Sequence, residues 1–332
     1  MRVGITIPLE GFQNRSVLDL ARRAEALGYT DLWSMESFGN DAFSPLAAAA
    51  AVTDRIRLGT AIVPVFTRPP ALIAMSSATV QQISNGRLIL GLGISTPVIV
   101  QQWMGIPFKK PVTLVRETTE ALRAIFAKNR VMMDGKLIKI NGFRLDFALD
   151  TPPPIFIGAQ GPQMLRIAGE IGDGVITNFI TPEALPAMLE HVKQGALAAG
   201  KDPTKHELVC RIVAVVDEDV AQTKTELRRY LTPYLTVQPY NNFFRGIGFE
   251  HEASEAFEAW NAGDRKKALA CVTDKMIESM FVFGDEQTCR RRLRAYATAG
   301  VTTATLYLTS FAKTPEEKRT SLLHAVEALA PN

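Results

Sequence analysis

The chain has 332 residues, of which 47% are hydrophobic and 21% are charged, and its 37 basic and 34 acidic residues leave a net charge of +3. This balance is typical of a globular protein with a large core. Because basic and acidic residues are interspersed, the chain lacks the basic stripe that nucleic-acid binding requires. We therefore expect its partners to be small molecules or further copies of itself, with no nucleic acid.

The cellular location is predicted from the cysteines and the apolar stretches. The 3 cysteines form no C-x-x-C pair, which argues against a disulfide framework and favours a reducing cytoplasm. An uncharged stretch over residues 88–108 is interrupted by glycines and prolines, so we expect strand, loop and turn there rather than a membrane span. The sequence predicts a cytoplasmic protein with no membrane partner.

Short apolar strands alternate with segments of helical periodicity along most of the chain. The predicted strands are residues 3–7, 31–34, 56–59, 88–92, 155–157, 174–177, 207–216 and 301–308. The predicted helices lie between them, at residues 16–28, 45–52, 69–85, 111–127, 162–171 and 182–199. This alternation is typical of parallel βα units. It predicts an α/β fold of the (β/α)8 TIM-barrel type, as a single domain over residues 1–332, with an open doubly wound sheet as the alternative.

Two segments break the alternation and are predicted to be insertions, near residues 129–150 and 230–275. The first contains Asp134-Gly135 and Asn141-Gly142, which are typical of hairpin turns. The second is rich in aromatic residues between positions 230 and 260. These aromatic side chains serve either helix packing or a dimer contact, or they form a hydrophobic wall or lid over an active site.

Several kinds of chemistry are excluded by motif and spacing. Gly91-Leu92-Gly93 begins like a dinucleotide fingerprint but lacks the third glycine, and the residues that follow do not form a G-x-S-x-G nucleophile motif. The histidines are dispersed, so no metal site is predicted; they are His191, His206, His251 and His324. A barrel without these groups is expected to take its reactivity from a cofactor.

Two segments are candidates for binding an anion. Gly158-Ala159-Gln160-Gly161 ends an apolar strand, and Pro162 then begins a helix, so backbone N–H groups and the helix N-terminus favour a phosphate there. The alternative is that the glycines only make a tight turn. Ser84-Asn85-Gly86-Arg87 is the second candidate, with a helix C-terminus followed by a surface or salt-bridged arginine as the alternative.

The order of these motifs resembles the bacterial luciferase-like superfamily. The segments that carry the resemblance are residues 56–60, Arg68-Pro69-Pro70, residues 84–93 and residues 158–162. Residues 169–174, together with the helix that precedes residues 199–201, resemble the coenzyme F420-dependent branch, which includes methylenetetrahydromethanopterin reductase. Residues 36–46 resemble a group of actinobacterial F420-dependent oxidoreductases.

The resemblance implies a barrel that binds a deazaflavin at the C-terminal ends of its strands. It implies a non-prolyl cis peptide at Ala61-Ile62 that supports the cofactor ring. The backbone of Gly158, Ala159, Gln160 and Gly161 would hold the phosphate-bearing tail, and Ser95 and Thr96 would line the same cleft. Hydride would pass between coenzyme F420 and a small organic substrate, and the protein would be a homodimer.

Departures from the family pattern argue against two of the substrates that relatives use. Relatives that oxidise glucose 6-phosphate carry an Asp-His pair and a later Glu where this chain has Glu36-Ser37 and Ile94. Methanopterin reductases carry a Glu where this chain has Thr6. Glu36 is therefore the candidate catalytic group, with a surface or N-cap-type carboxylate as the alternative. We expect an F420-dependent oxidoreductase of unidentified substrate; the alternatives are an FMN-dependent monooxygenase or a non-catalytic cofactor-binding protein of this fold.

Overall fold

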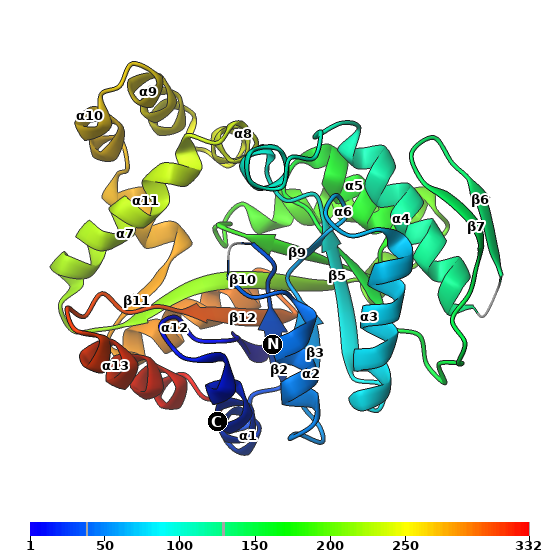
Figure 1. The fold of residues 1–332 in the computed structure, drawn as a ribbon. Coiled ribbons are helices and arrows are strands. Elements are labelled where there is room, and N and C mark those ends of the chain that lie inside the picture. Colours follow the sequence, from blue (N-terminus) through cyan, green and yellow to red (C-terminus); the bar gives the residue numbers. More distant parts are fainter. Residues whose placement is uncertain (38, 128–129, 332) are drawn as a thin grey trace.

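The structure is a computed structural model that describes residues 1–37, 39–127 and 130–331. Within these residues, parallel strands form a closed barrel (Figure 1). β1 pairs with both β2 and β12, and β10 pairs with both β9 and β12, so the ring has no free edge. In ring order the strands are β1 (Arg2–Thr6), β2 (Asp31–Ser34), β3 (Arg57–Thr60), β5 (Leu88–Gly93), β8 (Ile155–Gly158), β9 (Gly174–Asn178), β10 (Glu207–Val216) and β12 (Thr303–Leu308).

The (β/α)8 barrel is thereby confirmed, and each predicted strand is present with ends shifted by at most two residues. Helices cover the outside of the barrel (Figure 1). They are α1 (Val17–Ala26), α2 (Phe43–Ala50), α3 (Pro70–Ile83), α4 (Pro111–Phe126), α5 (Pro162–Ile171), α6 (Leu185–Ala198), α12 (Glu286–Thr298) and α13 (Pro315–Ala328). α2 begins before Pro45, where a helix start was predicted, because Asp41 Oδ1 accepts the N–H groups of Phe43 and Ser44, each at 2.9 Å.

The first insertion is an antiparallel hairpin of β6 (Val131–Asp134) and β7 (Lys139–Phe143); residue 129, where we placed its start, lies outside the described residues. Asp134-Gly135 begins the connection, as predicted. The expected turn at Asn141-Gly142 is wrong, because both residues lie inside β7. Gly142 has a φ of 80°, and the register shifts between Val131 and Met132, so this pair accompanies a bulge.

The second insertion is a group of helices that Figure 1 shows together at one corner of the barrel. The helices are α7 (Val220–Leu235), α8 (Gln238–Gly246), α9 (Glu250–Asn261), α10 (Arg265–Ala270) and α11 (Asp274–Met280). A short strand that was not predicted, β11 (Val282–Gly284), follows and pairs with the end of β10. Three residues are too few for periodicity to reveal a strand.

The barrel interior is arranged in layers. At the N-terminal ends of the strands Arg57 pairs with Asp31 at 2.6 Å and with Glu207 at 3.1 Å. Above this layer an apolar plug fills the barrel, formed by Trp33, Ile89, Phe156, Ile176 and Val209. Gly59 makes room for the plug, since a Cβ there would lie 2.2 Å from the Trp33 ring. The plug closes the barrel from below, so a ligand can enter only from the C-terminal ends.

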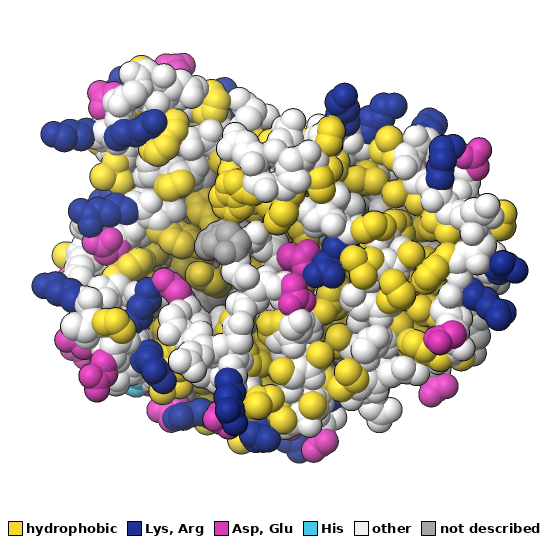
Figure 2. All heavy atoms as spheres, in the orientation of Figure 1, with side chains coloured by type: hydrophobic (Ala, Val, Ile, Leu, Met, Phe, Trp, Pro, Cys, Tyr) yellow, Lys and Arg dark blue, Asp and Glu magenta, His cyan; other side chains and the backbone are white. Residues whose placement is uncertain are grey.

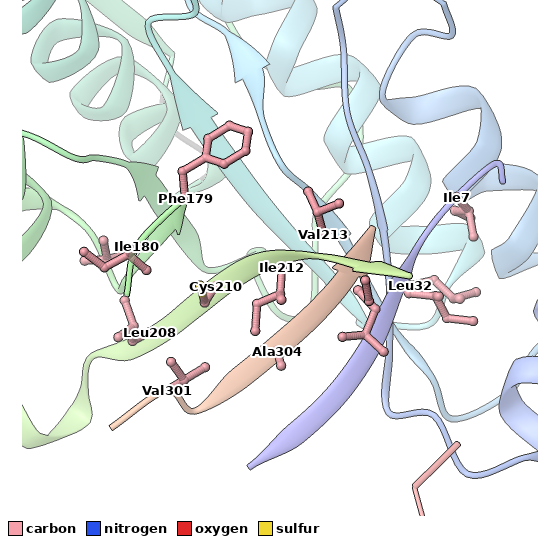
Figure 3. Packing of buried hydrophobic residues seen from close by; sticks show 14 of the residues in the cluster. Ile7, Leu32, Phe179, Ile180, Leu208, Cys210, Ile212, Val213, Val301 and Ala304 are labelled. Carbon is pink, nitrogen blue, oxygen red and sulfur yellow. The ribbon is translucent and has the colours of Figure 1, made fainter. Parts of the chain in front are cut away.

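The larger core lies between the strands and the surrounding helices. In Figure 3, Leu208, Cys210 and Ile212 of β10 are part of this outer core. Successive side chains of a strand point to opposite faces, and Val209 belongs to the interior plug. Arg211 follows Val209 on the same face of β10 and therefore points into the barrel, one layer above the plug.

Candidate active site

A cavity of about 1060 Å³ lies at the C-terminal ends of the barrel strands. Active sites of (β/α)8 barrels form at this end. Figure 2 shows hydrophobic side chains gathered in a hollow below α8. The cavity brings together every candidate site residue named from the sequence, which are Glu36, Ala61, Ile62, Ser95, Thr96, Gly158, Ala159, Gln160 and Gly161.

One wall of the cavity is the bulge between β3 and β4 (Val63–Pro64). The Ala61–Ile62 peptide bond is cis, as the family resemblance implied. The Ile62 side chain packs against the end of β5, where a Cβ on Gly93 would lie only 2.8 Å from Ile62 Cγ1. The glycine at the end of β5 therefore lets Ile62 sit at the cavity wall.

A second wall is the turn from β8 into α5. Gly161 is the N-cap of α5 and lines the cavity. Among the described residues no side chain caps this helix, so its N-terminal N–H groups are open to a ligand. Gln160 is turned towards β9, since its Nε2 donates to the backbone oxygen and to Oδ1 of Asn178, at 3.1 and 2.6 Å. An uncapped helix N-terminus is a favourable place for an anion.

Two polar side chains near this wall were missed by the sequence predictions. Thr177 Oγ1 and His191 Nδ1 are buried atoms without a hydrogen-bond partner within the described part of the chain, and both residues line the cavity. Buried polar groups are nearly always satisfied, so these two atoms are available to hydrogen-bond a molecule in the cavity. They come from β9 and α6, and no spacing in the sequence links them to the turn at residues 158–161.

The turn after β5 contributes Ser95 and Thr96 to the cavity. Ser95 has a φ of 60°, which turns the chain sharply at the end of the strand. Thr96 Oγ1 accepts the N–H of Ile99 at 3.4 Å, at the start of a short π-helix over Val98–Trp103. The Thr96 side chain is thereby held at the cavity edge.

Glu36 lies at the cavity edge after β2, and its carboxylate is fully engaged. Arg68 Nη2 donates to Oε2 at 2.7 Å, Arg68 Nε donates to Oε1 at 2.9 Å, and the Ala42 N–H donates to Oε2 at 3.1 Å. The hydrogen bonds to Glu36 raise the pKa of Arg68 against the effect of burial. The Glu36 side chain is only 15% exposed, so it is not a free surface carboxylate. Its bond to the N–H of Ala42, the N-cap residue of α2, fits the alternative of an N-cap-type carboxylate.

The aromatic segment forms the roof of the cavity. Tyr230, Tyr234, Tyr240 and Phe243 of α7 and α8 line it. Phe244 and Phe249 of the segment are core, and Phe244 packs edge-on against Phe179 with ring centroids 6.2 Å apart. Both expected roles, helix packing and a cavity wall, are therefore present.

The second anion candidate, residues 84–87, is wrong. Arg87 donates to the carbonyl oxygens of Ala50, Thr53 and Ile56 at 2.7–3.1 Å, so its guanidinium is already occupied. The segment ends α3 and ties it to the end of α2. The alternative is correct for the helix C-terminus. Arg87 itself is half-buried and forms no salt bridge with the described residues.

Neither metal ligation nor a membrane span emerges from the geometry. Over residues 1–37, 39–127 and 130–331, no group of three His, Cys, Asp or Glu side chains is placed to hold a metal ion. No helix in these ranges has the length and hydropathy needed to cross a bilayer.

The barrel and its cavity define a (β/α)8-barrel enzyme with its site at the C-terminal ends of the strands. The chain belongs to the luciferase-like monooxygenase family, whose profile matches residues 1–303. This match confirms the resemblance inferred from the motifs.

Individual relatives are also similar over most of their length. The chain is 31% identical over 285 residues to the 5,10-methylenetetrahydromethanopterin reductase of Methanolobus tindarius, covering 85% of this chain and 86% of that protein. The solved coenzyme F420-dependent tetrahydromethanopterin reductase of Methanopyrus kandleri has a TM-score of 0.80 and 25% identity, covering 99% of this chain and 97% of that one. An F420-dependent secondary alcohol dehydrogenase, at TM-score 0.78 and 20% identity over 99% and 98% of the two chains, shares the fold.

Proposed function

We propose that the protein is a coenzyme F420-dependent oxidoreductase that transfers a hydride between the deazaflavin and a small organic substrate. The observation that carries this proposal is one cavity that combines the Ala61–Ile62 bulge with an uncapped helix N-terminus and two unpartnered polar atoms. Two similar proteins support the proposal. The relative at 31% identity is named as a reductase, and the solved structure at 25% identity is named as a coenzyme F420-dependent reductase.

The residues present fit such a cofactor. Thr177 Oγ1 and His191 Nδ1, beside the N-terminus of α5, would hold its phosphate-bearing tail, together with the backbone of residues 158–161. Ala61 and Ile62 would support the ring, with Ser95 and Thr96 along the same cleft. When bound, the cofactor supplies the hydride, and the protein positions the substrate and excludes water.

Glu36 has a different proposed role from the cofactor residues. It lines the cavity at the side of β2 and holds Arg68, so it either donates a proton to the substrate or keeps Arg68 and the start of α2 in place. We retain proton donation as the proposal, and a variant that separates the two roles is described in the Discussion.

Cofactor choice is tested by titrating the purified protein with F420 and FMN side by side. F420 is expected to bind with micromolar Kd or tighter, about −8 kcal/mol, and FMN at least roughly tenfold more weakly, about 1.4 kcal/mol less. Equal or preferential binding of FMN would overturn the F420 assignment and favour the FMN-dependent monooxygenase.

A matched pair of isosteric variants tests the part of the cavity that is proposed to hold the phosphate-bearing tail of the cofactor. Thr177 and Thr118 both bury a hydroxyl that has no hydrogen-bond partner among the described residues, but only Thr177 lines the cavity. Thr177→Val should weaken F420 binding by roughly tenfold or more, since a hydrogen bond to a charged group contributes about 1.5–3 kcal/mol. Thr118→Val on α4 is the control and should leave the Kd unchanged. Equal effects of the two variants would remove Thr177 from the site.

The remaining parts of the proposal concern catalysis, assembly and location. An enzyme oxidises reduced F420 with some organic acceptor, whereas a cofactor-binding protein only binds it, so turnover with a panel of acceptors separates the two. We also propose a homodimer, tested by light scattering, and a cytoplasmic location, tested by cell fractionation.

A further inference from the structure

Arg211 is the feature of the cavity that the cofactor assignment leaves unused. It points into the barrel from the middle of β10 and lines the cavity. Its Nη1 lies 3.1 Å from Met35 Sδ, and its guanidinium carbon lies 5.3 Å from the centre of the Tyr307 ring. Neither contact neutralises its charge.

Two other largely buried arginines, with side chains 24% and 18% exposed, are paired with carboxylates. Arg57 contacts Asp31 and Glu207, and Arg68 contacts Glu36. Arg211 takes part in none of the ion pairs formed among the described residues. A guanidinium stays charged at every physiological pH, and an inward-facing charge without a partner is costly. An anion that enters the cavity would supply the missing partner.

Tyrosine side chains surround this guanidinium. Tyr230, Tyr234, Tyr240 and Tyr307 line the same cavity. Burial raises the pKa of Tyr230, Tyr240 and Tyr307, so these phenols stay protonated and can donate hydrogen bonds at neutral pH. Their rings offer flat apolar surface beside the cation, which suits a planar molecule with one charged end.

The position of Arg211 in the ring separates it from the residues proposed to support the cofactor ring. Those residues, Ala61 and Ile62, follow β3, whereas Thr177, proposed to hold the phosphate-bearing tail, lies on β9 next to β10. β10 lies four strands from β3 in either direction around the closed ring, so Arg211 and the Ala61–Ile62 bulge are on opposite sides. The tyrosines come from α7, α8 and β12, on the side of Arg211. This half of the cavity is available to the substrate.

We propose that Arg211 and the surrounding tyrosines form the substrate subsite, and that the substrate is a planar organic acid whose carboxylate pairs with the Arg211 guanidinium. Only one part of this inference rests on the proposed function, namely that the bound anion is the substrate. The pairing itself is a property of the free protein and can be measured without cofactor.

The experiment compares trans-cinnamate with trans-cinnamamide, which have nearly the same shape and differ in charge, by calorimetric titration of the cofactor-free protein. The wild type should bind the acid roughly tenfold or more tightly than the amide. Arg211→Met should abolish this preference, and Arg211→Lys should retain part of it. Arg292→Met is the matched control and should keep the preference, because Arg292 also lies over an aromatic ring, at 4.9 Å from the centre of Phe283, but outside the cavity.

Equal affinities of the wild type for acid and amide, including no measurable binding of either, would overturn the inference, as would a preference that survives Arg211→Met. If that variant does not fold in a thermal melt, Arg211→Gln takes its place.

F420 titration of the Arg211 variants distinguishes this inference from the proposed function. An unchanged F420 Kd supports the substrate assignment. A loss of F420 affinity with the acid preference intact would assign Arg211 to the cofactor and overturn the inference. If the wild type binds no F420 but shows the Arg211-dependent preference for the acid, the proposed function fails while the anion subsite stands.

Discussion

Replacing Glu36 by glutamine separates a chemical role of this carboxylate from a structural one. Arg68 donates to both carboxylate oxygens at 2.7–3.0 Å, and the two side chains are 18% and 15% exposed. Glutamine keeps the shape and one acceptor oxygen, but its amide group presents N–H to the Arg68 donors. The variant therefore leaves a largely buried guanidinium with only the more distant carboxylate of Asp41, whose Oδ1 lies 3.8 Å from Arg68 Nη2, as a negative partner.

The size of the structural effect follows from this burial. Breaking a fully buried ion pair costs about 3–5 kcal/mol, whereas an exposed pair contributes less than about 1 kcal/mol. Because both side chains are slightly exposed, we expect Glu36→Gln to lower the free energy of unfolding by about 2–3 kcal/mol. A chain of this length has an unfolding entropy of roughly 0.7 kcal/mol per degree, so Tm should fall by roughly 3–4 °C.

The assay compares Glu36→Gln, Arg68→Met and the double variant. Each is measured by thermal unfolding, by F420 titration and by oxidation of reduced F420 with the best acceptor found. If Glu36 donates a proton, Glu36→Gln should lower turnover by roughly 10²–10⁴-fold with little change in F420 affinity, and Arg68→Met should lower it much less. If Glu36 only holds Arg68, the two single variants should lose similar stability and activity, and the double variant should be no worse.

Two results would refute the reasoning. An unchanged Tm in Glu36→Gln would show that the ion pair does not stabilise the fold. Unchanged turnover and unchanged F420 affinity would remove Glu36 from the reaction, and the proton would then come from water or from the substrate itself.

Two further substitutions test the scaffold. Arg87→Met removes the donors from three carbonyl groups between the ends of α2 and α3, and urea unfolding should show a loss of about 2–4 kcal/mol without a change in F420 affinity; a loss that appears only in affinity would contradict the structural role. Glu117→Gln affects the β6–β7 hairpin, because the Glu117 carboxylate accepts the N–H groups of residues 136, 137 and 138, each at 2.8 Å. These hydrogen bonds, against the opposing effect of desolvation, lower the pKa of Glu117 below its ordinary value of 4.5, so the stability they provide is present above that value and is lost as pH falls through the lowered pKa. The stability difference from wild type, about 1–2 kcal/mol at neutral pH, should therefore shrink in acid, and a difference that stays constant down to low pH would contradict this account.

The strand pattern was predictable because a parallel strand is buried on both faces and appears in the sequence as a short apolar run with glycine or proline near its ends. Local patterns failed where a residue pair has more than one use. Asn141-Gly142 suits a hairpin turn, but here Gly142 supplies its positive φ to a bulge within β7. Ser84-Asn85-Gly86-Arg87 suits an anion site, but here Arg87 meets carbonyl groups from α2 and the loop after it.

The sequence by itself determined the barrel, the family and the strand ends proposed to bind ligands, because each depends on residues that are neighbours in the chain. Only the tertiary structure decided which side chains share the cavity. Thr177, His191 and Arg211 belong to three different elements, and each is unremarkable in its local sequence. Packing of the barrel strands and α6 places these residues around one cavity, where burial removes water. Among the described residues, Thr177 and His191 are left there with buried polar atoms that lack hydrogen-bond partners, and Arg211 is left without a carboxylate partner. Such a shortage of partners depends on distances in three dimensions, so no local pattern can reveal it.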